Sequence, residues 1–79
     1  MTDSTTTRLA EADETMAHVK QAVAELSPKQ KQVFILRYYQ DLALREIGEI
    51  MGLQIRTIKS HLFNALRNLR QLLADYVQI

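Results

Sequence analysis

The stretch LREIGEIMGLQIRTIKSHLFNALRNLRQLL, residues 44–73, decides the fold expected for this 79-residue chain. Gly52 suits the left-handed backbone conformation that ends a helix, so helices are expected over residues 44–51 and about 55–77. A steep crossing of two helices through a short turn needs a small residue at the close approach, and Gly48 lies there. The apolar contacts expected around this turn are Ile47, Met51, Leu53 and Ile58. The pattern predicts a helix-turn-helix, although a tight corner in a helical bundle would use the same residues.

The predicted helix over residues 55–77 has two different faces. An apolar stripe at about 100° per residue is expected to face the core: Ile55, Ile58, Leu62, Ala65, Leu66, Leu69, Leu73 and Tyr76. The opposite side and its flanks carry Arg56, Thr57, Lys59, Ser60, His61, Phe63, Asn64, Arg67 and Arg70. Arginine and lysine pair with guanine edges or phosphates, asparagine pairs with adenine, and an apolar ring meets a thymine methyl group. Phe63 therefore indicates a groove-reading surface, unless its ring packs against the helix expected over residues 28–40 or against a partner.

Two further helices are expected upstream. Apolar residues at alternating steps of three and four predict a helix from Arg8 to Leu26, preceded by a disordered tail over residues 1–7. Ser27 is expected to cap the next helix with its hydroxyl group, and Pro28 fits the first turn, where its missing N–H costs nothing. This helix is expected to end near residue 40. Its inward-facing residues are expected to be Val33, Phe34 and Leu36.

Composition places the chain among single all-α domains. It has no cysteine, so neither disulfides nor thiolate metal sites are available to it. No apolar run approaches the ~20 residues of a membrane span, and the start lacks the apolar stretch of a signal peptide, which predicts a cytoplasmic protein. We therefore expect one compact four-helix domain over residues 8–79 that contains the helix-turn-helix and has no wing.

Charge is distributed unevenly along the chain. Residues 1–26 carry two basic and five acidic side chains, a net charge of −3, whereas residues 27–79 carry eight basic and four acidic ones, a net charge of +4. This asymmetry favours a polyanionic partner for the second part. Ordinary solvated helix faces would give the same pattern, so charge alone does not decide between the two.

Three segments in this order and spacing carry a family resemblance: LSPKQKQVFILRYY at residues 26–39, LREIGEIMGL at 44–53 and TIKSHLFNAL at 57–66. Over residues 10–73 the chain resembles region 4 of a bacterial sigma factor of the extracytoplasmic-function (ECF) type. The resemblance implies that the helix beginning near Ile55 enters the major groove of the promoter minus-35 element in double-stranded DNA. It also implies docking on the flap of the RNA polymerase beta subunit, and occlusion of these surfaces by an anti-sigma factor.

The resemblance also implies roles for individual residues. The base-reading positions of the family motif fall on Arg56, Lys59, Ser60, Phe63 and Asn64. The phosphate contacts fall on Arg45, Thr57 and Arg67, with His61 as a further candidate that could equally be polar cover. Arg37, in the helix over residues 28–40, is expected to support the recognition helix.

Some positions depart from the family pattern. Ala43 and Gln54 stand where a hydroxyl residue often caps each helix of the motif, which weakens each start by about 1 kcal/mol. Asn64 replaces a common basic residue and Arg56 replaces a small one, so the preferred bases are expected to differ. The separate sigma domain that reads the minus-10 element is missing, so we expect an excised domain or a stand-alone relative.

Two other functions fit parts of the pattern. A response-regulator effector domain shares the Leu26-Ser27-Pro28 opening, but that class usually stops soon after its recognition helix and dimerises through it, whereas here an apolar pattern continues over residues 65–73. A protein-interaction relative that has lost DNA affinity would fit the acidic first helix and the weak net charge.

Catalysis is not expected from this sequence. His18 and His61 fall on different predicted helices, with no cysteine and no paired carboxylate cluster around them. We therefore expect no cofactor, no metal and no enzymatic activity.

Overall fold

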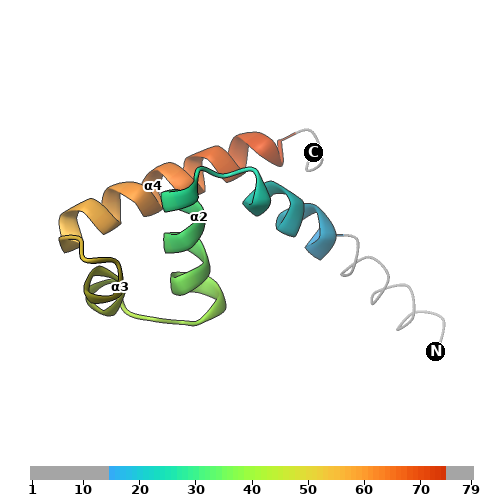
Figure 1. Ribbon diagram of the computed structural model, residues 1–79. Helices are drawn as coiled ribbons and strands as arrows, with labels where there is room; N and C mark the ends of the chain where they lie inside the picture. The colour runs from blue at the N-terminus through green and yellow to red at the C-terminus, as the bar shows by residue number, and fades with distance from the viewer. Residues whose placement is uncertain (1–14, 75–79) are drawn as a thin grey trace, which may run out of the picture.

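The computed structural model describes residues 15–74, which are helical over most of their length (Figure 1). The helical segments cover residues 15–24, α2 (Pro28–Phe34), η1 (Ile35–Tyr39), α3 (Leu44–Met51) and α4 (Ile55–Leu72). Because η1 continues α2 without a break, these segments make four helices within the described residues, and the predicted all-α four-helix class is confirmed. The predicted tail over residues 1–7 and the predicted start of the first helix at Arg8 lie outside the described residues.

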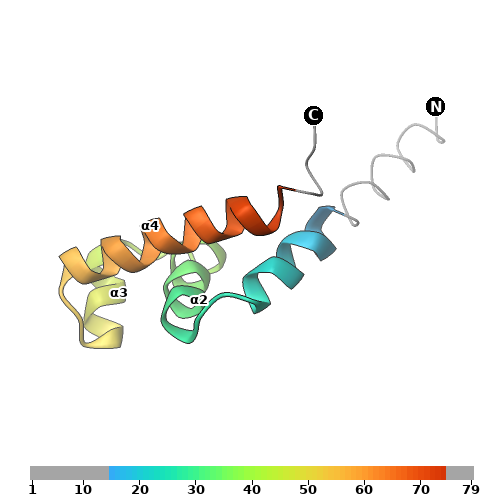
Figure 2. The same ribbon diagram turned by 90° about the horizontal axis from the view of Figure 1, so that it is seen from above.

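The longest helix, α4, is the element on which the others are arranged. Both α2 and α3 pack against it, and residues 15–24 lie near its C-terminal half (Figures 1 and 2). The side-chain amide of Asn68 in α4 donates a hydrogen bond of 2.8 Å to the amide oxygen of Gln30 in α2. The sequence pattern did not predict this bond, which joins α4 to α2 through two residues that lie 38 positions apart in the sequence.

The start of α2 is where the sequence places it, but its cap differs. Ser27 is the N-cap residue with an extended backbone, and Pro28 occupies the first turn, as predicted. The Ser27 hydroxyl makes no capping hydrogen bond, so that part of the prediction is wrong. Ser27 is exposed, and water is therefore available to the free N–H groups of the first turn.

The end of this helix winds more loosely than an α-helix. In η1 the N–H of Gln40 donates to the carbonyl of Ile35 at 3.1 Å, five residues back, and the N–H of Leu42 donates to Leu36 at 3.1 Å. Asp41 then takes a left-handed conformation with φ of 57°. The predicted end near residue 40 is confirmed, but the π-helical turn was not foreseen, because apolar periodicity does not distinguish it from an α-helical one.

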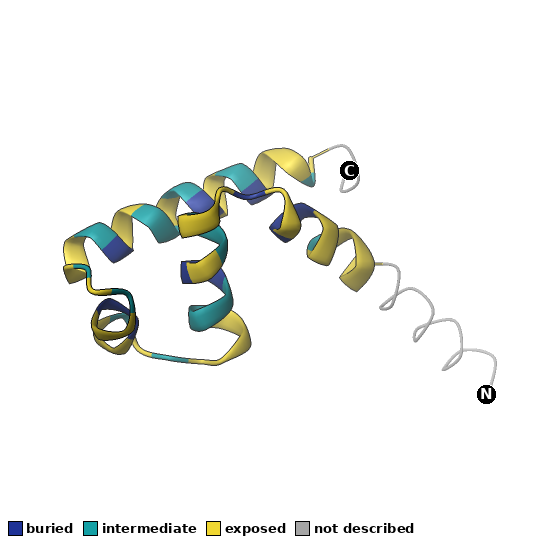
Figure 3. Cartoon of the chain, in the orientation of Figure 1, coloured by how far each residue is buried: buried dark blue, intermediate teal, exposed yellow. Residues whose placement is uncertain are grey.

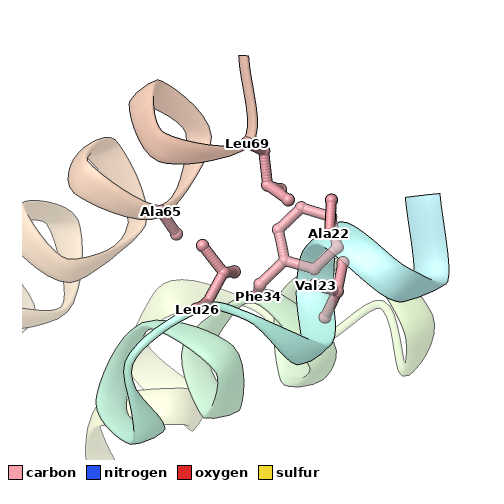
Figure 4. Packing of buried hydrophobic residues seen from close by; sticks show 6 residues of the cluster. All are labelled: Ala22, Val23, Leu26, Phe34, Ala65 and Leu69. Atoms are coloured by element: carbon pink, nitrogen blue, oxygen red, sulfur yellow. The ribbon is translucent and has the colours of Figure 1, made fainter. Parts of the chain in front are cut away.

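Two apolar clusters form the core. We call the first the motif cluster: Val33, Ile47 and Ile58, all fully buried, with Leu36, Leu42, Leu44, Met51, Leu53 and Leu62 packed around them. We call the second the terminal cluster: Ala22, Val23, Leu26, Phe34, Ala65 and Leu69 (Figure 4). The adjacent residues Val33 and Phe34 belong to different clusters, so α2 separates the two. The predicted inward direction of Val33 and Phe34 is confirmed, and Leu36 is half-buried.

The turn between α3 and α4 depends on two glycines. Gly52 has φ of 68°, and its N–H and that of Leu53 both point to the carbonyl of Gly48, the latter at 2.9 Å. A Cβ atom on Gly48 would lie 2.7 Å from the carbonyl oxygen of Leu53 and 3.8 Å from Ile58. The predicted need for a small residue at Gly48 is confirmed, but the tightest neighbour is the backbone of the turn and not the second helix.

The apolar stripe of α4 is narrower than predicted. Ile58, Ala65 and Leu69 are buried, and Leu62 and Leu73 are half-buried. Ile55 and Leu66, which were expected in the core, are 42% and 38% exposed. They lie at the edge of the stripe, and Ile55 lines an open depression beside Arg45, Gly48 and Glu49 of α3. The helix ends at Leu72, and residues 73–74 form a turn. The predicted extension of the helix to Val77 is therefore wrong at residues 73–74. Tyr76, which was predicted in the apolar stripe, lies outside the described residues.

The two glycines of the turn should respond differently to alanine. Gly48→Ala is expected to destabilise the fold by roughly 1 to 3 kcal/mol through overpacking, although alanine alone favours a helix by about 1 kcal/mol. Gly52→Ala meets no atom within 4 Å, so only left-handed strain of about 1 to 2 kcal/mol is expected. Urea unfolding measures both, and a Gly48→Ala variant more stable than the native chain would contradict the close contact.

Removal of a fully buried side chain of the motif cluster should be costly. Ile58→Ala is expected to lower the free energy of unfolding by about 2 to 5 kcal/mol, because it leaves a cavity between three helices. Ile55→Ala, on the same helix but 42% exposed, is the matched control and should change stability far less. Equal losses of the two variants in urea unfolding would show that the facing of α4 is misassigned.

Candidate nucleic-acid interface

The face of α4 that points away from the core carries most of the predicted site. Arg56, Ser60, Phe63 and Arg67 follow one another at steps of three or four and are exposed, opposite the buried Ile58, Ala65 and Leu69 (Figure 3). Lys59 is also exposed, whereas Thr57, His61 and Asn64 are half-buried at one flank. The structure therefore brings all the predicted base-reading residues onto one helix, with Asn64 at the edge of the surface. We use the name α4 face for the exposed surface formed by Arg56, Lys59, Ser60, Phe63 and Arg67.

Phe63 is the most exposed large apolar residue of the described chain. Its side chain is 65% exposed, so the interpretation in which it packs against α2 is wrong. Burial of an aromatic ring is worth several kcal/mol, and no neighbour in the described residues provides it. The ring is instead displayed between the cations of the α4 face.

The charge of α4 has one sign. The helix contains Arg56, Lys59, Arg67 and Arg70 and no acidic residue. None of these cations forms an ion pair with a carboxylate of the described residues, where Arg37 pairs with Asp41 at 3.9 Å. Their charge is therefore available to an external anion.

The first turns of α3 and α4 add backbone donors beside this surface. Ala43 and Gln54 are the N-cap residues and neither makes a side-chain capping bond, as their types predicted. Arg45 is exposed on α3 and lines an open depression next to Gln54 and Ile55. Uncapped N–H groups at a helix start and a nearby guanidinium suit a phosphate oxygen.

Arg37 does not join this surface. Its guanidinium donates to the carbonyl of Leu42 at 3.1 Å, and its Cζ lies 5.8 Å from the centre of the Tyr38 ring. Its contacts are therefore with η1 and the loop that leads into α3. These contacts lie before α3 and not on α4, so the expected support of the recognition helix by Arg37 stays a prediction.

The described residues contain neither a membrane-spanning helix nor a cluster of metal ligands. No helix between residues 15 and 74 combines the length and the apolar character needed to cross a membrane. The same part of the chain holds no group of three or more histidine, cysteine or carboxylate side chains placed to bind a metal ion.

A short helix joined through a glycine turn to a longer helix with an exposed basic side has the architecture of a helix-turn-helix domain. Residues 22–71 match the family described as Sigma-70, region 4. The chain belongs to this family, which confirms the resemblance drawn from the sequence.

The individual relatives are sigma factors. The chain is 42% identical over 50 residues to the RNA polymerase sigma factor SigV of Bacillus subtilis, a match that covers 63% of this chain and 30% of SigV. It is 33% identical over 57 residues to the ECF RNA polymerase sigma factor SigW of the same organism, covering 72% of this chain and 30% of SigW. It is 36% identical over 50 residues to the RNA polymerase sigma-E factor of Streptomyces antibioticus, covering 63% of this chain and 28% of that protein. The match thus spans less than a third of each relative.

Phe63 should matter little for folding because its ring is exposed. Phe63→Ala is expected to leave the free energy of unfolding within about 0.5 kcal/mol of the native value. Leu69→Ala, which removes a buried side chain of the same helix, is the contrasting variant. A large loss of stability for Phe63→Ala in urea unfolding would mean that the ring packs in the fold after all.

Proposed function

We propose that this domain binds the minus-35 element of a promoter, as the region 4 domain of an ECF-type sigma factor that acts with RNA polymerase in transcription initiation. The observation that carries the proposal is the α4 face, a basic surface on a rigid helix whose other side is anchored in both core clusters. The family and the names of the relatives support it. The proposed role is recognition, without a catalytic step.

Sequence would be read by side chains near the N-terminal half of α4. Arg56 and Lys59 carry donors that suit the O6 and N7 atoms of guanine, and the exposed ring of Phe63 suits a thymine methyl group. Ser60 donates to or accepts from either kind of base. Asn64 would reach a base only at the edge of the contact, because it is half-buried.

Register on the DNA would be set by contacts with phosphates. Arg45 on α3 and Arg67 on α4 are both exposed, and they lie on the two helices that would face the backbone of the duplex. Thr57 and His61 are half-buried at the flank of α4, where a hydroxyl or imidazole group meets a phosphate oxygen more readily than a base edge. Such contacts add affinity for all sequences alike.

A second surface suits a protein partner. A mostly apolar groove on α2 and η1 is lined by Pro28, Lys31, Gln32, Ile35 and Leu36. No residue of α4 lines this groove, so a partner there would leave the α4 face free for DNA. The flap of the polymerase beta subunit is the partner that we propose for it, and an anti-sigma factor would compete for one or both surfaces.

Base-reading and phosphate residues should be separable by mutation. Lys59→Ala is expected to cost roughly 1 to 3 kcal/mol on a minus-35 duplex and much less on random duplex, because it loses a base contact. Arg67→Ala should weaken binding to both duplexes equally. It should also reduce the slope of the logarithm of the binding constant against the logarithm of the salt concentration by about one. Fluorescence anisotropy with the two duplexes measures this, and equal losses for Lys59→Ala on both would remove it from the base-reading set.

The same titration tests the function as a whole. A duplex-binding domain must lose affinity steeply as salt rises, since its cations displace condensed counterions. Absence of binding at about 50 mM salt, or binding without salt dependence, would favour the protein-interaction relative instead. A dimer in solution that prefers a palindrome would favour the response-regulator class.

A further inference from the structure

The entry into α3 is irregular and lacks the usual cap. The chain leaves η1 through Asp41, which has φ of 57°, and reaches Ala43, an N-cap residue whose methyl group accepts no hydrogen bond. An eight-residue helix is marginal without tertiary support. Its first turn therefore depends on whatever holds residues 42 and 43.

One peptide group of this loop is held from both sides. The carbonyl of Leu42 accepts a hydrogen bond of 3.1 Å from Nη1 of Arg37, and the N–H of Ala43 donates one of 2.8 Å to Oε1 of Glu46. These two atoms belong to the same peptide group, the one that joins Leu42 to Ala43. A cation from η1 and an anion from α3 thus bind opposite ends of one dipole, an arrangement that we call the peptide clamp.

The arm from η1 is itself held in place. The guanidinium of Arg37 lies 5.8 Å from the centre of the Tyr38 ring, within the range of a cation–π contact, and that ring packs 4.9 Å from the buried Phe34 ring. The ion pair of Arg37 with Asp41 contributes less, because the Asp41 side chain is 97% exposed and the atoms are 3.9 Å apart. The hydrogen bond to Leu42 is therefore the main contact of Arg37 with the loop.

The clamp lies directly before the residue that is proposed to meet DNA from α3. Arg45 is the second residue of α3, so its position follows from the path of residues 42–43. We propose that Arg37 and Glu46 are positioning residues whose clamp on the Leu42–Ala43 peptide group holds the first turn of α3 so that Arg45 reaches a DNA phosphate. This rests on the proposed function, and it adds two residues to the binding apparatus that never touch DNA themselves.

Glu46 allows a test in which charge is matched. Glu46→Gln and Glu46→Ala both remove the negative charge, but only glutamine keeps an oxygen that accepts from the N–H of Ala43. On a minus-35 duplex, Glu46→Gln should bind at least as tightly as the native chain, while Glu46→Ala should bind about three- to tenfold more weakly than Glu46→Gln, the worth of one hydrogen bond. Equal affinities of the two variants would overturn the proposal.

Glu46→Gln and Glu46→Ala can also be compared in a chain that carries Arg45→Ala. This comparison separates an effect on the position of Arg45 from a general loss of stability. If the clamp acts through Arg45, the difference between alanine and glutamine at residue 46 should vanish when Arg45 is absent. An undiminished difference in that background would mean that the clamp serves the fold alone, and the proposal would be wrong.

Arg37 supplies an independent arm of the test. Arg37→Met and Lys29→Met each remove one cation, but only the former opens the clamp, so Arg37→Met should bind the duplex at least threefold more weakly than Lys29→Met. Equal affinities of these two variants would also count against the clamp.

A readout without DNA keeps the two proposals distinguishable. Amide exchange of Ala43 should be faster in Glu46→Ala than in Glu46→Gln if the clamp forms as described. Slow exchange with no binding of the native chain to any duplex would refute the proposed function and, with it, the role of the clamp in DNA contact. Salt-dependent binding of the native chain with no effect of the Glu46 or Arg37 variants would refute the clamp alone.

Discussion

Three fully buried side chains, Val33, Ile47 and Ile58, meet where α2, α3 and α4 converge. This contact is possible only because Gly48 lets the carbonyl of Leu53 come within 2.7 Å of the place where a Cβ would stand. A larger residue there would push the turn away from α3 and separate Ile47 from Ile58. Since α3 has eight residues, too few to be stable alone, its position relative to α4 depends on this packing site together with the contacts that hold residues 42 and 43.

The α4 helix joins the core to the candidate interface within one rigid body. Its buried residues alternate with exposed cations, so the spacing of Arg56, Lys59 and Arg67 is set by helical geometry at about 1.5 Å per residue. No loop has to fold for these side chains to be aligned. What the rest of the fold contributes is the orientation of α4 relative to α3, and hence which residues of the two helices can approach one duplex together.

The N-termini of α3 and α4, which have no side-chain cap, bear on both the fold and the proposed function. At α4, Gln54 leaves the first-turn N–H groups without a side-chain partner, next to Arg45 and the open depression at the turn. At α3, the polar groups of the peptide before the helix are instead bound by Arg37 and Glu46. The first-turn N–H groups of both helices thus remain available to an external anion, while the peptide group before α3 is also held from within the protein.

Much of this protein was determined by the sequence alone. Period 3.6 patterning, Pro28 and Gly52 placed the helices and the turn, because each acts through local backbone geometry. Gly48 marked the close approach of the turn, where its missing Cβ makes room for the carbonyl of Leu53. The cationic side of α4 followed from the same periodicity. The family was recognisable from three short segments because their residues serve these local requirements in a fixed order.

Only the tertiary structure decided the remainder. Whether Ile55 and Leu66 are buried depends on how far α2 and α3 extend across α4, which no local pattern encodes. The exposure of the Phe63 ring, the π-helical turn and the missing Ser27 hydroxyl bond likewise depend on how the elements sit against one another and against water. The bonds from Asn68 to Gln30 and from Arg37 to Leu42 join groups that only the packed helices bring within reach. Local chemistry therefore set the elements, and non-local packing set which side chains are left to meet a partner.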